Sequence, residues 1–370
     1  MLDAALLFAF LPAAAPAPPV TGNSAYSQQL LAWNPGEIRC DGAAVPGTAL
    51  RPGVDVATMD PQRIKPISYR FAIDGAGRTH SIVRDSGSVS PFGQDIDPAL
   101  AASRFAAGAP RANCEISYSP QFASLAQAPL ADIAAYSIFP TGPRLPKAGW
   151  DRFAAAGDCR DKPRPVALLR ARPDFAKLKA TPGVRDWSLV TYDTDDEGTP
   201  VNVRIAHGTG NDELDTAAIE AVRASRFTGG ARTGCLYPYW RGAAKIAAPE
   251  RPDKAAMRPA NAACPAKIEW ASRPTTSYPT AYRKRAIEGW AMVSFDVAPW
   301  GEVGNVKLLE AQPSADFGGQ AISIVRSGRV VPSARGASGC VETVKFLMPD
   351  RNQADDEDET PVQRQDVPIF

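Results

Sequence analysis

The stretch IEGWAMVSFDVAPWGEV, residues 287–303, has alternating apolar positions that lead to a glycine at Gly301. Such alternation predicts a strand with one buried face, and a glycine between two such strands predicts the turn of a hairpin. Looser copies precede it, centred on Gly77 and Gly198. The aligned positions before the three glycines are Tyr69, Phe71 and Ile73; Val190, Tyr192 and Thr194; and Val293, Phe295 and Val297. The chain therefore contains three predicted hairpins.

Six cysteines bracket the three glycines. Each glycine lies 37 to 39 residues from one cysteine on either side. An even number of cysteines in a secreted chain favours disulfides, and the repeat predicts the pairs Cys40–Cys114, Cys159–Cys235 and Cys264–Cys340. Zinc binding is the alternative, but no two cysteines lie closer than 29 residues and no CxxC knuckle exists. We expect no metal site and no cofactor.

A helical pattern follows each hairpin, and a closing strand begins at each second cysteine. The helical patterns cover residues 96–105, 214–227 and 317–330, and shorter ones precede two hairpins, at 175–179 and 281–286. The predicted fold class is α+β, with three tandem modules of helix, β-hairpin, helix and β-strand. Each module has a three-stranded antiparallel sheet. Their expected ranges are residues 24–121, 145–246 and 258–349. Cores this small are marginal, which explains a disulfide in each.

The segment SYPTAYRKRAIEGWAMVSFDVAPWGEVGNVKLLEAQP, residues 277–313, resembles the C-terminal domain of TonB. The matching positions are Tyr278, Pro279, Ile287, Glu288, Gly289, Gly301 and Pro313. The two earlier copies are similar mainly through hairpin and helix. The resemblance implies a TonB/TolA-like fold and a periplasmic interaction module. In that family the exposed last strand pairs with a short peptide at the N-terminus of an outer-membrane receptor.

The last strand of the third copy is the predicted peptide-binding site. An edge strand offers unpaired N–H and C=O groups to an incoming strand. VETVKFLM contains no proline, whereas Pro238 interrupts the corresponding strand of the second copy. The predicted binding residues are Val341, Glu342, Thr343, Val344, Lys345 and Phe346. The alternative is that every last strand is a structural edge capped by a neighbouring module.

Composition and motifs argue against other functions. Lys and Arg (41) nearly balance Asp and Glu (40), so a nucleic-acid partner is not expected. His80 and His207 lie 3 and 9 residues after their glycines and define no shared site. The acidic turn at residues 193–198 resembles the opening of a calcium loop, but Arg204 stands where a bidentate Glu is needed. We predict a protein that is not an enzyme; a secreted hydrolase is the alternative.

The two ends of the chain differ from its middle. The apolar run at residues 4–15 is too short to span a bilayer and predicts a signal peptide over residues 1–17, hence a periplasmic protein without a membrane span. Residues 160–179 hold seven basic residues against two aspartates, which suits anionic polymers or a solvated linker. The acidic tail, 350–370, is predicted to be disordered. The expected function is peptide or protein binding by strand addition, linked to TonB-dependent transport. The alternative is an energy transducer whose membrane anchor is missing from this sequence.

Overall fold

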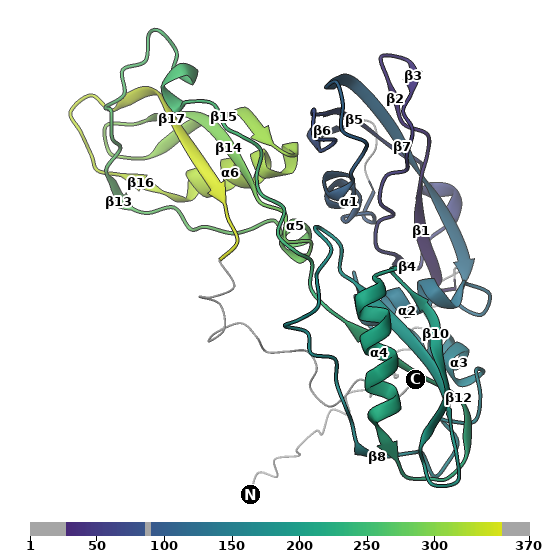
Figure 1. Cartoon of the computed structure of the whole chain (residues 1–370). Coiled ribbons are helices and arrows are strands. Elements are labelled where there is room, and N and C mark those ends of the chain that lie inside the picture. The colour runs from purple at the N-terminus through teal and green to yellow at the C-terminus, as the bar shows by residue number, and fades with distance from the viewer. Residues whose placement is uncertain (1–26, 86–89, 350–370) are drawn as a thin grey trace, which may run out of the picture.

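The computed structural model describes residues 27–85 and 90–349 as three larger antiparallel sheets and two two-stranded ones, with helices packed on the larger sheets (Figure 1). The fold is α+β, as predicted. The predicted signal peptide and acidic tail lie outside the described residues. Within those two ranges, no helix is both long and apolar enough to cross a membrane. The division into modules at the predicted boundaries remains a prediction.

The first sheet is larger than expected. Its elements are β1 (Gln29–Pro35), β2 (Arg39–Cys40), β3 (Ala43–Ala44), β4 (Asp55–Ala57), the 3-10 helix η1 (Pro61–Arg63), β5 (Ile67–Ile73), β6 (Thr79–Arg84), α1 (Ile96–Ala102) and β7 (Arg111–Ser124). The prediction of three strands is wrong here, because seven strands join. Between residue 27 and the β5–β6 hairpin the structure has no α-helix; η1 stands before the hairpin instead. β7 is interior, since β1 and β2 pair with one edge and β5 with the other.

The second and third sheets each have three strands, in the orders β10-β9-β12 and β15-β14-β17. Between the first and second sheets lie α2 (Leu130–Ile138) and α3 (Lys147–Ala154). The part of the chain that contains the second sheet has the elements β8 (Ala167–Leu169), β9 (Trp187–Thr194), β10 (Pro200–Gly208), α4 (Asp212–Ala224), β11 (Arg226–Phe227) and β12 (Arg232–Trp240). The part that contains the third sheet has the elements η2 (Lys254–Met257), β13 (Trp270–Ser272), α5 (Thr280–Lys284), β14 (Gly289–Val297), β15 (Val303–Gln312), α6 (Ala315–Ser327), β16 (Arg329–Val330) and β17 (Ala337–Phe346).

The two short helices predicted before the hairpins had different outcomes. The helix expected at residues 281–286 is present as α5, which begins at Thr280. The helix expected at residues 175–179 is wrong, because that segment forms only a hydrogen-bonded turn in which Lys177 N–H bonds Asp174 O. Pro182 follows closely and disfavours helical backbone in the residue before it, so the turn has little room to extend.

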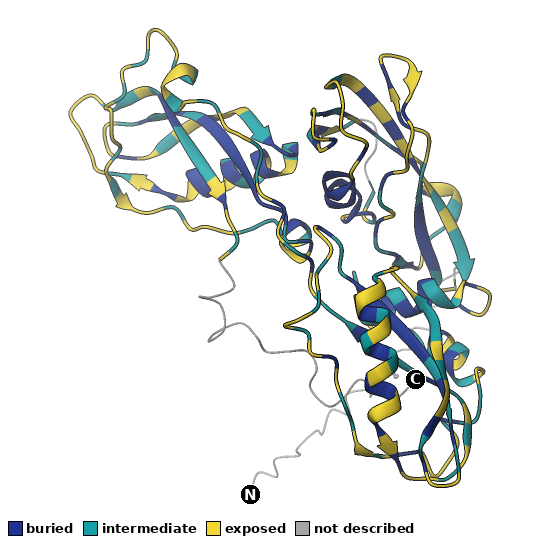
Figure 2. Ribbon diagram, in the orientation of Figure 1, coloured by how far each residue is buried: buried dark blue, intermediate teal, exposed yellow. Residues whose placement is uncertain are grey.

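The long helices cover one face of the second and third sheets. Asn211 caps the start of α4 and Ser314 that of α6, because their side chains accept N–H groups of the first helical turn. Each helix turns a buried stripe toward its sheet, including Leu214 and Val222 in α4 and Phe317 in α6. Figure 2 shows the alternation of buried and exposed residues along α4. This is the amphipathic pattern that the sequence predicts.

The three hairpins share unusual backbone geometry. Gly77, Gly198 and Gly301 have positive φ, and a Cβ on each would lie within 2.0 Å of a backbone oxygen on the segment that follows the helix. Four residues after each glycine a second positive φ occurs, at Ser81, Asn202 and Asn305. A third occurs just before each second cysteine, at Asn113, Gly234 and Gly339. Only glycine can therefore occupy the turn position, and the same bulged conformation recurs in each hairpin.

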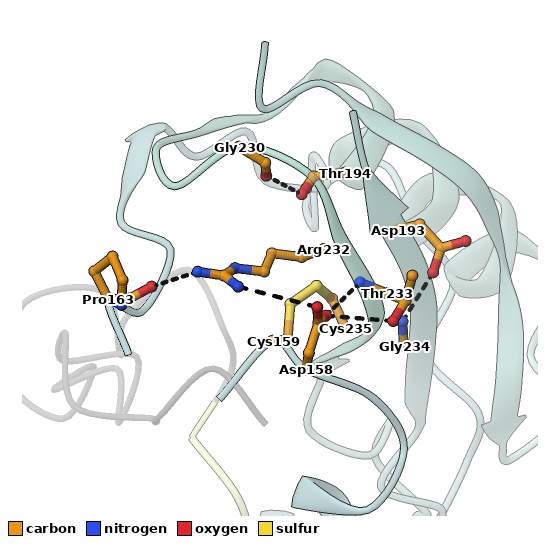
Figure 3. Close-up of a disulfide and its surroundings, with 10 residues drawn as sticks. All are labelled: Asp158, Cys159, Pro163, Asp193, Thr194, Gly230, Arg232, Thr233, Gly234 and Cys235. Carbon is orange, nitrogen blue, oxygen red and sulfur yellow. Dashed lines mark hydrogen bonds and ion pairs between the residues drawn. A yellow bond between two sulfur atoms is a disulfide. The ribbon is translucent and has the colours of Figure 1, made fainter. Parts of the chain in front are cut away.

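Three disulfides join Cys40 to Cys114, Cys159 to Cys235 and Cys264 to Cys340, the pairs expected from the spacing. Figure 3 shows the surroundings of the second. Next to it, Thr233 N–H donates to Asp158 Oδ1 at 2.7 Å, and Arg232 Nη2 donates to Pro163 O at 2.9 Å. The disulfide and these bonds attach the segment after α3 to β12.

Buried contacts connect the three sheets. Arg285, just after α5, donates to both carboxylate oxygens of Asp95 at 2.7 and 2.5 Å and to Gly183 O at 2.9 Å. Ile82 N–H of the first sheet donates to Pro313 O of the third at 2.9 Å. A hydrophobic cluster holds residues of both, among them Ile82 and Phe317, and a second cluster joins the first and second sheets through Leu30 and Leu189.

Candidate peptide-binding edge

β17 lies at the edge of the third sheet and carries the predicted binding residues. On its inner side it pairs with β14, in a register that sets Phe346 opposite Gly289 and Cys340 opposite Phe295. Among the described residues no strand pairs with its outer side between Val341 and Phe346. The nearest backbone pairing on that side is an isolated bridge between Ala263 and Ser338. The structure thus places the six predicted residues in succession along one edge strand.

The outward direction of one backbone donor can be identified. Thr343 N–H donates to the Glu342 side chain, at 3.0 Å from Oε1. An N–H that faced β14 would be bonded within the ladder, so this donor faces the open edge. The two-residue period of a strand gives Val341 and Lys345 the same direction. The Oγ1 of Thr343 is buried and has no hydrogen-bond partner among the described residues.

The two faces of β17 have different surroundings. Phe346 packs against the rings of Tyr278 and Phe317, at centroid distances of 5.7 and 5.1 Å. Val344 is half-buried against the same cluster. On the opposite face Val341 is buried and Lys345 is exposed. The strand is therefore fixed by its packing, while Lys345 and the backbone of the outer edge remain accessible.

The chain itself shields the first half of this edge. Ala263 and Ser338 exchange two backbone hydrogen bonds of 3.0 and 3.1 Å. Lys254 of η2 lies 3.5 Å from Glu342, measured from Nζ to Oε2. The open half of the edge is Thr343–Phe346. The sequence did not reveal this shielding, because Lys254 and Ala263 belong to a segment without a strand pattern.

The residues that resemble the TonB motif have clear structural roles around β17. Glu288 Oε1 accepts the N–H of Met348 at 2.9 Å, just after the strand ends. Tyr278 Oη donates to Ile287 O at 2.5 Å, and burial followed by the nearby Glu288 raises the pKa of Tyr278, which keeps its proton. A Cβ on Gly289 would lie 2.7 Å from Gln312 O and from the ring of Phe317. These motif residues therefore position the start of β14 and the end of β17.

The corresponding strands of the other sheets present no such edge. Counting three residues beyond the second cysteine gives Ser117, Pro238 and Thr343. Ser117 O already accepts Gly36 N–H at 2.9 Å, and β1 pairs with β7 beyond it. Pro238 has no N–H to offer. Among these three positions, Thr343 alone combines an outward N–H with the absence of a neighbouring strand in the described residues.

Comparison with known proteins agrees with this geometry. Residues 274–347 match the family model described as Gram-negative bacterial TonB protein C-terminal. These residues are a TonB C-terminal domain. Protein TonB of Klebsiella pneumoniae is 36% identical over 77 residues, which are 21% of this chain and 31% of that protein. Protein TonB of Escherichia coli strain K12 is 37% identical over 77 residues, 21% of this chain and 32% of that protein. The chain thus spans about a third of the length of these relatives.

The TonB C-terminal domain includes all six predicted binding residues and the third disulfide's Cys340, while Cys264 precedes it. Such domains take part in TonB-dependent interactions of the cell envelope. The three disulfides fit a location outside the cytoplasm. The match does not extend to the first two sheets, so their likeness to this domain rests on the shared hairpin geometry.

The other polar features do not form a second site with the edge. His80 is on β6, where burial lowers its pKa, and His207 is on β10, so they lie in different sheets. In the acidic turn, Asp195 Oδ1 accepts two N–H groups of its own turn, from Glu197 and Thr199. No group of three or more potential metal ligands occurs within residues 27–85 and 90–349.

Proposed function

We propose that this protein works in the periplasm and binds an extended peptide segment of an envelope protein on the open half of β17. The peptide adds a fourth strand to the third sheet. The observation that supports this proposal most directly is the outward N–H of Thr343, at an unpaired strand edge inside a TonB C-terminal domain. An outer-membrane receptor of TonB-dependent transport is the partner that the family suggests. The partner supplies the backbone groups that the edge lacks.

Backbone pairing accounts for affinity and the flanking side chains for selection. Each hydrogen bond gained adds about 0.5 to 1.5 kcal/mol net, so Thr343–Phe346 alone supports modest affinity. Glu342 has to release Thr343 N–H when a peptide binds. Lys345 is exposed next to the incoming strand, which favours a peptide with an acidic residue opposite it, worth about 0.2 to 1 kcal/mol.

The test is a binding assay with peptides that cover the N-terminal segments of outer-membrane receptors from the same organism. Lys345→Pro removes one outward N–H, whereas Lys345→Ala removes the charge and keeps the N–H. A proline at an outward position leaves the β14 ladder intact, so both variants should fold. We expect Lys345→Pro to weaken binding about fivefold more than Lys345→Ala, measured by fluorescence anisotropy. Equal affinities of the two variants would reject strand addition at this edge.

A further inference from the structure

The strand β8 exposes an apolar strip that the proposed function does not use. Val166, Leu168 and Leu169 are 62%, 71% and 56% exposed, the largest exposures among apolar residues of the second sheet's elements. Figure 2 shows most of β8 as exposed. β8 pairs only with β11, so its other edge is open in the described residues. An apolar strand with an open edge requires a partner or risks aggregation.

The corresponding strand of the third sheet lacks this feature. β13 pairs with β16 as β8 pairs with β11. In β13 the large side chain is Trp270, which is half-buried and stacks on Phe295 at 6.2 Å. Its exposed residues are Ala271 and Ser272. The apolar exposure is therefore particular to β8 and is not required by the ribbon itself.

Basic residues flank the strip on both sides in the sequence. Arg164 precedes it, and Arg170 and Arg172 follow it. No ion pair is found for Arg164, Arg170 or Arg172 in the described residues. Arg170 instead stacks over Tyr237 at 5.0 Å. The strip thus combines an apolar centre with cationic ends that have no carboxylate partner there.

One segment of the same chain has the complementary composition. Residues 350–370 carry seven acidic residues and two arginines, a formal charge of −5, against +5 for residues 160–179. Five acidic residues are consecutive, at 355–359, and the segment ends in Val367, Pro368, Ile369 and Phe370. It therefore matches the strip in both respects, with carboxylates for the arginines and an apolar end for Val166 and Leu168.

We propose that residues 350–370 dock on the β8 strip of their own chain. The 21 residues can extend over about 70 Å, more than twice the diameter of a 100-residue domain. The acidic run binds the arginines, and the C-terminal Val367–Phe370 covers Leu168 and its neighbours. This contact shields the open edge of β8.

Photocrosslinking in the full chain tests the contact. A benzophenone side chain is placed at position 168, and at position 201 as a control, because Val201 is an exposed apolar residue of β10 in the three-stranded second sheet and has no arginine two residues away on either side. We expect mass spectrometry to identify crosslinks to residues 350–370 from position 168, at least fivefold more than from position 201. Replacing the five acidic residues by Asn and Gln, or raising NaCl from 50 to 500 mM, should lower the yield at least fivefold.

Two results would overturn the proposal. One is an equal yield from positions 168 and 201, or crosslinks that join only different chains when isotope-labelled and unlabelled protein are mixed. The other is the absence of tail crosslinks together with flotation of the full chain on anionic phosphatidylglycerol vesicles that Leu168→Ser abolishes. That outcome would assign the strip to a membrane surface. Circular dichroism melting of each variant checks that it is folded.

Discussion

The buried ion pair between Arg285 and Asp95 should be the strongest single connection between the third and first sheets. Both side chains are less than a tenth exposed. Asp95 also accepts Gly53 N–H at 2.6 Å, and Arg285 also holds Gly183 O of the segment before β9. Replacing Asp95 by Asn keeps the shape of the side chain and removes its charge. The change leaves the guanidinium of Arg285 buried without a counterion.

The expected loss is large because the dehydration of Arg285 is no longer offset. Breaking a buried pair by removing one partner costs about 3 to 5 kcal/mol. Arg185 lies nearby as a second buried cation. Burial lowers its pKa to about 10, although the charge of Asp95 acts in the opposite direction. Burial alone would raise the pKa of Asp95, but Arg285 lowers it below its usual value overall. The pair's contribution is therefore complete at neutral pH and is lost only as the pH falls below about 4.

Urea unfolding at pH 7, followed by tryptophan fluorescence, measures this loss. Asp95→Asn and Arg285→Met should each lower the free energy of unfolding by about 3 to 5 kcal/mol, and the double variant should cost at least about 2 kcal/mol less than their sum. Glu37→Gln is the control, because its ion pair with Arg39 is exposed and worth less than about 1 kcal/mol. A loss below about 1 kcal/mol for Asp95→Asn, or full additivity in the double variant, would refute the reasoning.

Three further outcomes are expected. Replacing Cys159 and Cys235 by Ala opens a loop with a sequence separation of 76 and should lower stability by about 4 kcal/mol in urea, and an unchanged midpoint would contradict this. Gly198→Ala should cost at least twice as much as Gly210→Ala in a thermal melt: both positions have positive φ, but only at Gly198 would the Cβ meet a backbone oxygen at 1.8 Å. Burial and then Asp97 raise the pKa of Asp316 to about 6, so its ionisation lowers stability as the pH rises through 6. Asp316→Asn should therefore stabilise the protein at pH 7.5 and not at pH 4.5. The gain should be less than about 1 kcal/mol, because the side chain of Asp316 keeps solvent contact. Urea midpoints measured at the two pH values test this.

Features that depend on local chemistry were accessible from the sequence. Gly301 is needed because Val330 O occupies the place of a side chain, and the same holds for Gly198 and Phe227 O, so the glycines mark the hairpins directly. The alternation before each glycine reflects one buried face, for example at Val293 and Phe295. Alternation and turn chemistry act over a few residues, which is why they can be recognised in a single sequence.

Features that depend on distant pairing were not accessible. β1 pairs with the second half of β7, as in Gln29 with Ser124, which are 95 residues apart in the sequence, and no local pattern indicates this partner. α2 occupies the connector expected between residues 121 and 145, where it packs on the first and second sheets through residues such as Ile133. The shielding of β17 by Ala263 is of the same kind. The sequence therefore identified the candidate edge strand and missed which half of it is open.

The different states of the three last strands explain why similarity of fold need not give similarity of binding. An unpaired edge invites aggregation unless it is covered, interrupted or used. β7 is covered by β1, and β12 is interrupted at Pro238, so neither needs a partner at that position. β17 is covered only in its first half, by Ala263 and Lys254. Strand addition by a partner would then depend on the open outer edge at Thr343–Phe346. A sheet that shares only the hairpin with the third sheet would therefore not bind a peptide in this way.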